Sequence, residues 1–284
     1  MTNVTLRPIS FGEILDQAFS LFRRLFVPLV LVQIICTGVI IPLQLFVAAG
    51  GRQFSALYLV TVLINMIASA LASAAVALLI SENYLGRSLG AGGALKLALP
   101  KIGPVILLSM ALGLVLIVSA IPAGIAFASG MAILVPLGTG TAATAGLDRL
   151  PMAAGLMLTG FALLLVPLAV FAGLAVSTPA LVIENIGAGA ALQRSWSLTR
   201  RFRLRTIGLL LLTAILIGIP FLGVTLLVTM LPSDAAILLA QALSLLVLLI
   251  LTPLIYCVLT LLYYDLRVRK EGFDLQVLAD SLAA

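Results

Sequence analysis

GAALQRSWSLTRRFRLR, the stretch from Gly189 to Arg205, is an arginine-rich amphipathic segment that separates two long apolar runs. Its pattern recurs near the start of the chain. When Gly189 is aligned with Gly12, GAALQRSWSLTRR pairs with GEILDQAFSLFRR, and the Gly, Leu, Ser, Leu, Arg and Arg positions coincide. A fainter copy begins at Gly92. A polar segment that recurs before apolar runs indicates a chain built from repeated units.

The composition places the chain in a bilayer. Of its 284 residues, 63% are hydrophobic and only 9% are charged, which leaves too little polar surface to cover a soluble globule of this size. The formal net charge is +6, but the basic residues lie in short gaps between apolar runs and not in one soluble domain. Such a distribution sets membrane topology. We therefore expect membrane lipid as a partner and no nucleic acid.

Six apolar runs have the length of a membrane span, for which about 20 residues suffice. They cover residues 27–49, 56–80, 104–128, 152–177, 206–231 and 236–264. We therefore predict an all-α, polytopic membrane protein with about six transmembrane helices. The stretch 129–150 is rich in Gly, Ala and Thr, and we expect a re-entrant or surface loop there.

The N-terminal segment has the pattern of an interfacial helix. Ser10 and Glu13 have the spacing of a capping box, which marks a helix start. From Phe11 to Phe26 the apolar residues fall on one helical face and the acids and arginines on the other. A helix with two such faces suits the plane of the membrane interface.

The distribution of basic residues predicts the orientation. Fourteen Lys and Arg residues fall on the side that holds both termini, and only Arg52 and Arg149 fall on the other side. Because basic residues concentrate on the cytoplasmic side of a membrane, we expect both termini in the cytoplasm.

Two further regularities support the repeat. An Ile-Pro pair occurs in the first, third and fifth runs, and its prolines, Pro42, Pro122 and Pro220, lie 30, 30 and 31 residues beyond the aligned glycines. The even-numbered runs end in an acidic residue. We therefore predict one transmembrane domain, 1–284, with three units at about 10–82, 90–184 and 187–265 and a cytoplasmic tail at 266–284. Each unit would be an interfacial amphipathic helix followed by a transmembrane hairpin.

The acidic residues that end the even-numbered runs are Glu82, Glu184 and Asp265. In a three-unit protein they would lie around a pseudo-threefold axis, where an acidic cluster could bind a cation or an amine. The alternative is that each acid pairs with a nearby arginine or caps the next helix.

Clustered arginines form the second candidate site, because basic residues at the cytoplasmic interface attract anionic lipid or a membrane protein partner. The residues are Arg23, Arg24, Arg200, Arg201, Arg203 and Arg205. The alternative is that they only fix the topology.

A third pattern lies inside the second run. Asn65, Ser69, Ser73 and Ala77 recur every four residues, which indicates either close helix packing or a path for a substrate.

Enzymatic chemistry has no support in the sequence. The chain contains no histidine, which excludes Ser-His and Cys-His pairs and His-ligated metals. Its ten acidic residues are scattered singly. We therefore expect no catalytic residue, no metal site and no cofactor.

Three motifs resemble those of a family of bacterial integral membrane proteins of unknown function, which is named after the membrane domain fused to some glycerophosphoryl diester phosphodiesterases. They are RPISFGEILDQAFSLFRR (7–24), ALQRSWSLTR (191–200) and YYDLRVRKEGFDL (263–275). The resemblance implies a bacterial inner-membrane protein with about six spans. It does not imply phosphodiester hydrolysis, because the catalytic domain of those fusions needs histidines and clustered metal-binding carboxylates.

These observations leave two functions open. The first is a non-enzymatic scaffold or accessory subunit in envelope or lipid processes. The second is a carrier or flippase for a lipid or small amphiphile. A densely packed interior would favour the scaffold, whereas an open hydrophilic cavity lined by Gln33, Asn65 or Ser69 would favour the carrier.

Overall fold

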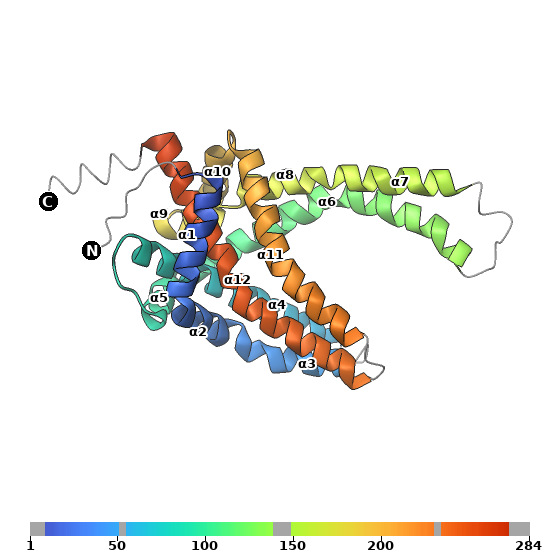
Figure 1. Cartoon of the computed structure of the whole chain (residues 1–284), viewed down its shortest axis with the longest axis horizontal. Coiled ribbons are helices and arrows are strands. Elements are labelled where there is room, and N and C mark those ends of the chain that lie inside the picture. Colours follow the sequence, from blue (N-terminus) through green and yellow to red (C-terminus); the bar gives the residue numbers. More distant parts are fainter. Residues whose placement is uncertain (1–8, 51–54, 139–148, 230–233, 273–284) are drawn as a thin grey trace.

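The protein is described by a computed structural model over residues 9–50, 55–138, 149–229 and 234–272, and all regular structure in these ranges is helical (Figure 1). In chain order the elements are α1 (Phe11–Arg24), α2 (Phe26–Cys36), η1 (Gly38–Ile40), α3 (Ile41–Gly50), α4 (Ser55–Tyr84), α5 (Ala91–Ala98), η3 (Leu99–Lys101), α6 (Ile102–Gly138), α7 (Leu150–Leu163), α8 (Leu165–Leu174), α9 (Ser177–Glu184), α10 (Ala188–Thr199), α11 (Arg203–Thr229) and α12 (Asp234–Glu271). The predicted all-α class is confirmed.

Five helical stretches are long and apolar enough to cross a membrane. They are Ala56–Tyr84, Ala91–Leu134, Leu150–Glu184, Arg203–Leu226 and Leu238–Glu271. A sixth is reached if α1 and α2, which meet at a bend of 76°, count as one broken span. These numbers agree with the prediction of about six apolar helices.

The first apolar run differs from the continuous span predicted at 27–49. It is divided into α2, η1 and α3, with the break beginning at Thr37. The Thr37 hydroxyl donates to the carbonyl of Gln33 at 2.8 Å. Pro42 has no N–H and therefore cannot continue the helical hydrogen bonds into this break, but it is tolerated in the first turn of α3.

Helix α1 begins with the predicted capping box. The Ser10 hydroxyl accepts from the Glu13 N–H at 3.3 Å, and the Glu13 carboxylate accepts from the Ser10 N–H at 2.6 Å. The buried residues of α1 are Ile14, Ala18, Leu21 and Phe22. In Figure 1, α1 runs across the ends of the longer helices instead of parallel to them.

Two boundaries differ from the sequence-based expectation. Residues 129–138, which we expected in a loop, continue α6 as helix to Gly138, and residues 139–148 lie outside the described residues. Residues 131–134 are Met, Ala, Ile and Leu, which continue the apolar run of α6, whereas the threonines of the stretch begin at 139. The tail predicted from 266 begins as the last turns of α12, which ends at Glu271 before Gly272 with a φ of 62°.

The third basic segment is also divided. Helix α10 ends at Thr199, residues 200–202 form a turn, and α11 begins at Arg203. The structure therefore distributes the arginines of Gly189 to Arg205 over a helix, a turn and the start of the next helix. The threefold repeat stays a prediction.

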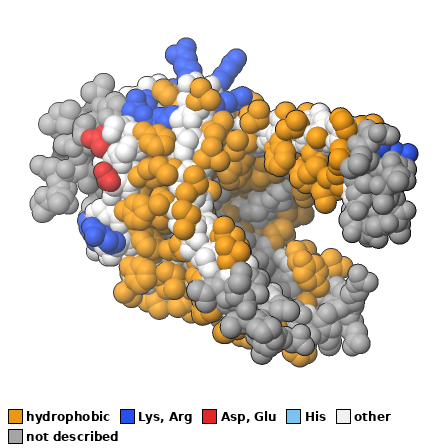
Figure 2. Space-filling model, turned by 45° about the vertical axis from the view of Figure 1, so that its right-hand side comes forward, with side chains coloured by type: hydrophobic (Ala, Val, Ile, Leu, Met, Phe, Trp, Pro, Cys, Tyr) orange, Lys and Arg blue, Asp and Glu red, His pale blue; other side chains and the backbone are white. Residues whose placement is uncertain are grey.

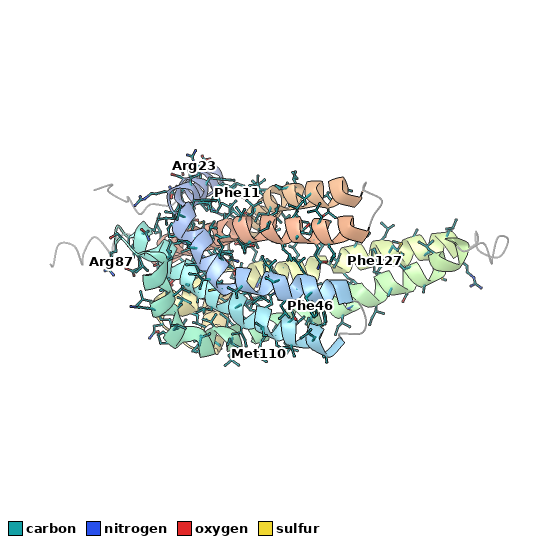
Figure 3. All side chains as sticks on the ribbon, turned by 90° about the horizontal axis from the view of Figure 1, so that it is seen from below. Phe11, Arg23, Phe46, Arg87, Met110 and Phe127 are labelled. Carbon is teal, nitrogen blue, oxygen red and sulfur yellow. The ribbon has the colours of Figure 1, made fainter. Side chains whose placement is uncertain are left out.

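Burial is concentrated at one end of the molecule. We call this end, where α1, α5, α10 and the last turns of α12 lie, the basic end (Figure 1). The last third of α12 is its centre, with Leu261, Leu262, Tyr263 and Tyr264 almost fully buried. In Figure 3, Arg23 and Arg87 lie at the basic end, whereas Phe46 and Phe127 lie farther out along the helices.

Away from the basic end the helices form two diverging arms. Figure 1 shows α6 and α7 extending together, apart from α3, α4, α11 and α12. Figure 2 shows a hollow between the arms and hydrophobic side chains over their visible surface. Ile117 on α6, for example, is 65% exposed. A surface this apolar is typical of helices that face lipid.

Candidate functional site

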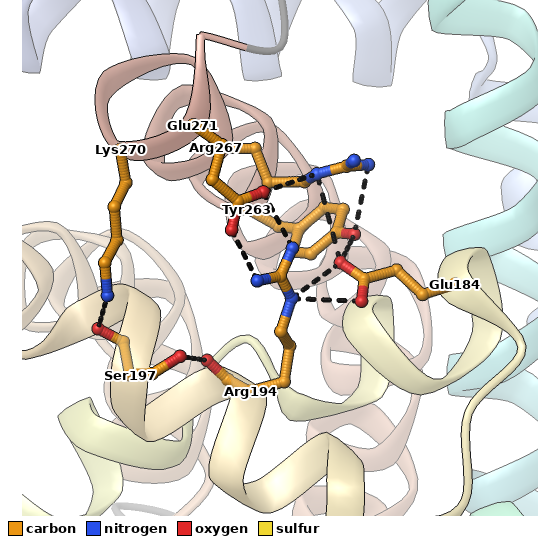
Figure 4. A network of polar contacts seen from close by, with 7 residues as sticks. All are labelled: Glu184, Arg194, Ser197, Tyr263, Arg267, Lys270 and Glu271. Carbon is orange, nitrogen blue, oxygen red and sulfur yellow. Dashed lines mark hydrogen bonds and ion pairs between the residues drawn. The ribbon is translucent and has the colours of Figure 1, made fainter.

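The predicted acid Glu184 belongs to a network that joins α9, α10 and α12 (Figure 4). We call Glu184, Arg194, Tyr263, Arg267 and Glu271 the Glu184 cluster. Arg194 Nε donates to both Glu184 oxygens, at 2.9 and 3.0 Å. Its terminal nitrogens donate to Glu271, one of them at 2.7 Å to Oε2. The Tyr263 hydroxyl donates to Glu184 at 2.6 Å, and Arg267 Nε lies 3.4 Å from Glu271.

The bidentate contacts of Arg194 with two carboxylates stabilise its protonated form and hold its side chain in one position. The hydrogen bond to Glu271 is the largest cause that raises the pKa of the Arg194 guanidinium above its ordinary value, and Glu184 adds to it while burial opposes it. Arg194 therefore braces α10 against α9 and α12. Within the cluster, the Nε and both terminal nitrogens of Arg194 each donate to a carboxylate, so its contacts serve to join the three helices.

The predicted acid Asp265 lies in a second network, which we call the Ile9 clamp. The Asp265 side chain is fully buried and accepts from the Ile9 N–H at 3.0 Å. Arg205 Nη2 lies 3.1 Å from one Asp265 oxygen, and Arg269 Nε lies 3.0 Å from both. Arg205 and Arg269 also donate to the Ile9 carbonyl, at 2.5 and 2.6 Å. The clamp holds Ile9, two positions before α1 begins, against α11 and α12.

The third predicted acid, Glu82, lies 3.5 Å from Arg87 in an exposed ion pair. Each of the three carboxylates thus lies against an arginine, and no hydrogen bond or ion pair within the described ranges joins one carboxylate to another. Among the described residues there is also no group of three or more His, Cys, Asp or Glu side chains that could hold a metal ion.

The predicted arginines fall into two groups. Arg203 stacks over the Trp196 ring with its guanidinium carbon 3.9 Å from the centroid, and Arg205 belongs to the Ile9 clamp. The other four are exposed and form no hydrogen bond or ion pair with any described residue. They are Arg23, Arg24, Arg200 and Arg201.

A cavity of about 200 Å³ lies between α2, α3, α4 and α12, at some distance from both charged networks. We call it the polar cavity. Its polar lining residues are Gln33, Thr37, Gln44, Asn65, Ser69, Thr252 and Tyr256, and Ile41, Leu245, Leu248 and Leu249 complete it. Asn65 and Ser69 lie in the middle of α4, and Thr252 lies in the middle of α12.

The polar stripe of α4 divides into two parts. Asn65 and Ser69 line the polar cavity, whereas Ser73 and Ala77 are buried. The Ser73 hydroxyl donates to the Ala70 carbonyl of its own helix at 2.9 Å. The sequence indicated either helix packing or a path for a substrate. Asn65 and Ser69 face a cavity, as a substrate path would, whereas Ser73 and Ala77 are buried in the packing between helices.

A second cavity, of about 230 Å³, lies on another side of α12, between α6, α8 and α9. Its lining is mostly apolar, and Leu112, Leu116 and Phe171 contribute to it. Thr252 and Tyr256 line both cavities.

Pro253 shapes this part of α12. A proline inside a helix cannot donate to the carbonyl four residues earlier, which here belongs to Leu249, a lining residue of the polar cavity. The neighbouring Thr252 hydroxyl donates to the Leu248 carbonyl at 2.5 Å. The proline thus leaves one backbone acceptor of α12 without its helical partner.

Sequence reasoning identified Gln33, Asn65 and Ser69 and missed the contributions of Thr37, Gln44, Thr252 and Tyr256. The missed residues do carry a signal. Thr37 follows Gln33 by four positions, and Tyr256 follows Thr252 by four, which places each pair on one helical face. Nothing in the sequence shows that α2, α3, α4 and α12 bring these faces together.

No family model, no curated protein and no solved structure matches this chain.

Proposed function

We propose that this chain is a non-enzymatic carrier of the bacterial inner membrane, which takes a lipid or other small amphiphile between its helices. The polar cavity is the observation that supports this proposal. It has the lining that we expected for a carrier, namely Gln33, Asn65 and Ser69, and it lies halfway along α4 and α12. A densely packed interior would have favoured the scaffold.

The energetics of the bilayer support a ligand in this cavity. Polar side chains inside a membrane usually hydrogen-bond across helices, because the hydrocarbon offers them no partner. Gln44 and Asn65 form no hydrogen bond with any described residue, although both line the cavity. A polar headgroup would supply their partners while its tail stays in the lipid.

The proposed orientation places the basic end in the cytoplasm. It rests on the excess of Lys and Arg on the side of both termini. With this orientation the polar cavity lies within the bilayer and the arms extend toward the periplasm. The three repeat units and the likeness to the family of bacterial membrane domains belong to the same proposal.

The scaffold is the second candidate, and the four exposed arginines favour it. Arg23, Arg24, Arg200 and Arg201 are exposed at the basic end and form no ion pair with another described residue. Cytoplasmic arginines of this kind attract anionic headgroups or an acidic surface of a membrane protein partner. A carrier can use the same arginines, so the two candidates differ in the role of the cavity.

The carrier is tested by lipid movement in reconstituted vesicles. Vesicles of bacterial polar lipid would contain traces of lipids with several headgroups, each tagged with a fluorophore on its acyl chain. Dithionite, which cannot cross the membrane, bleaches the outer leaflet. We expect protein-containing vesicles to lose more fluorescence than the outer leaflet holds for at least one headgroup.

The matched variants are Ser69→Phe, which fills the polar cavity, and Ser129→Phe, which places the same ring on the exposed surface of α6. The first should abolish the movement and the second should preserve it. If no tagged lipid moves faster than in protein-free vesicles, the carrier proposal is wrong and the scaffold remains.

The contribution of the exposed arginines is tested separately. Replacing Arg200 and Arg201 together by Gln should lower the amount of anionic lipid that co-purifies with the protein several-fold, because each exposed arginine near the surface contributes about 1 kcal/mol to anionic lipid attraction. Native mass spectrometry measures the bound lipid. Arg149→Gln removes an exposed charge outside the basic segments and serves as the control. If the unchanged protein and both variants retain the same amount of anionic lipid, Arg200 and Arg201 do not bind lipid and only help to set the topology.

A further inference from the structure

We infer that the polar cavity recognises an uncharged, hydroxyl-bearing headgroup no larger than about one sugar ring. This inference rests on the proposed carrier function and specifies its substrate class. It is carried by an unpaired buried acceptor, by the hydrogen-bonding state of the surrounding side chains, by the absence of charge from the lining and by the size of the space.

The unpaired acceptor is the side-chain oxygen of Gln33. Gln33 is only 5% exposed, and its Oε1 is buried with no hydrogen-bond partner among the described residues. A buried acceptor without a hydrogen-bond partner lowers the stability of the fold by the free energy of removing that group from water. Such atoms are therefore rare in folded proteins. Because Gln33 lines the polar cavity, a donor in that cavity would satisfy it.

The neighbouring hydroxyl groups also offer acceptors. Thr37, Ser69 and Thr252 each donate their proton to a backbone carbonyl of their own helix. A hydroxyl oxygen that has donated its proton keeps lone pairs, so each can still accept a hydrogen bond. These three hydroxyl groups can therefore accept hydrogen bonds from donor groups on the ligand.

The amide groups and the phenol complete the requirement. Gln44, Asn65 and Tyr256 line the cavity and form no hydrogen bond with another described residue. Each of these side chains offers both a donor and an acceptor. A hydroxyl group is also both, so a headgroup that carries several hydroxyls matches the whole lining, whereas a group with acceptors alone leaves Gln33 unpaired.

The lining excludes a charged headgroup. None of the residues around the polar cavity is acidic or basic. A phosphate or an ammonium group taken out of water is strongly penalised unless an opposite charge accompanies it. Arg205 and Arg269, which could balance a phosphate, are held by Asp265 in the Ile9 clamp.

The size of the cavity limits the headgroup. An apolar cavity of about 150 Å³ holds one benzene molecule, and the polar cavity is about 200 Å³. It therefore has room for one substituted six-membered ring. Its wall includes Leu248, which is 37% exposed, so the cavity is not sealed from the surrounding hydrocarbon and an acyl tail can leave on that side.

The test is a competition assay in lipid nanodiscs. A photoactivatable monoglucosyl dioleoylglycerol is cross-linked to the protein, and three unlabelled lipids with the same acyl chains compete. They are monoglucosyl dioleoylglycerol, dioleoyl phosphatidylglycerol and trioleoylglycerol. We expect only the first to compete. Gln33→Met and Asn65→Leu should each weaken its binding about tenfold, the effect of leaving one or two hydrogen bonds unmade.

Two controls separate binding from folding. Gln193→Met makes the same change at an exposed position of α10 and should bind normally. Gln33→Met removes a buried unpaired oxygen, so its thermal unfolding midpoint should equal or exceed that of the unchanged protein while its binding falls.

The outcomes distinguish this inference from the proposed function. If phosphatidylglycerol or trioleoylglycerol competes as well as the glucosyl lipid, the headgroup class is wrong while a carrier function still stands. If the glucosyl lipid does not bind but another tagged lipid moves in the vesicle assay, the inference again fails alone. If no lipid binds and none moves, both fail.

Discussion

Asp265 shows how one buried carboxylate organises the basic end. Its side chain has no exposure to solvent, and two guanidinium groups and one backbone N–H surround it. A buried charge is tolerated only when opposite charge and hydrogen bonds compensate for its lost hydration. Arg205 and Arg269 supply the charge, and the same arginines bind the Ile9 carbonyl.

We expect Asp265→Asn to destabilise the protein by about 3 kcal/mol, because removing one partner of a buried ion pair leaves the other charges uncompensated. Asparagine keeps the shape of the side chain, so the loss reports the charge. The measurement is reversible unfolding in detergent micelles.

Glu82→Gln is the matched control for that experiment. It removes a carboxylate whose partner Arg87 is 75% exposed, and exposed pairs contribute less than about 1 kcal/mol. If both variants lose the same stability, the Ile9 clamp does not have the role that its burial indicates.

Individual contacts at the basic end differ in whether the sequence predicts them. The capping box was readable because Ser10 and Glu13 are local partners at a fixed spacing. The Ile9 clamp is not predictable in this way, because Asp265, Arg205 and Arg269 bind the backbone N–H and carbonyl of Ile9, and every residue type has these backbone groups. The sequence does indicate Asp265, but its partners are Arg269 one turn later in α12, Arg205 of α11 and the backbone of Ile9.

At the scale of elements, the α6–α7 arm depends on close backbone approach. A Cβ added at Gly160 of α7 would lie 3.1 Å from the Phe127 nitrogen and 3.2 Å from the Ala123 carbonyl oxygen, both on α6. Between membrane helices such contacts replace the hydrophobic driving force, which lipid removes.

We therefore expect Gly160→Val to destabilise the arm by roughly 1–3 kcal/mol through overpacking. Gly155→Val is the control, since a Cβ at Gly155 of the same helix meets nothing within 4 Å. Thermal unfolding in detergent measures both. Equal midpoints for the two variants would mean that the close approach at Gly160 does not contribute to the stability of the arm.

Element lengths were predictable because apolar runs of about 20 residues are visible without any structure. Element breaks were less so. At the interruption near Thr37, the Thr37 hydroxyl donates to the Gln33 carbonyl, and Pro42 follows in the first turn of α3. A hydropathy average over about 20 residues detects neither feature. The stretch 129–138 differs from the expected loop because the glycines and threonines that indicate a loop lie mostly at 138–146, whereas residues 131–134 are apolar and extend α6.

The whole molecule combines a well-packed basic end with arms whose surfaces are apolar. Ile219 on α11 is 66% exposed, and Leu158 on α7 is 69% exposed. In water such surfaces would associate, whereas in a bilayer they meet lipid. The polar cavity could be anticipated from single residues of α2 and α4, but α3 and α12 complete it, and no periodicity predicts that meeting.

The orientation can be tested with single cysteines. Cysteines at 55 and 233 should react with an impermeant thiol reagent added outside the cell, and one at 281 should not; residues 233 and 281 lie outside the described residues. The native Cys36 and Cys257 are buried, which keeps the background low. Labelling at 281 from outside would reverse the proposed topology.

The Ile9 clamp also has a consequence for biogenesis. Ile9 and Asp265 are 256 residues apart, so at translation rates of about 5–20 residues per second the ribosome needs tens of seconds to deliver the acid after the isoleucine. During that interval α1 has no anchor on α12. In the proposed orientation α1 faces the cytoplasm, and we expect a cytoplasmic protease to cut nascent chains arrested before α12 near α1 far faster than finished chains. The last helix would then be a checkpoint for completed synthesis.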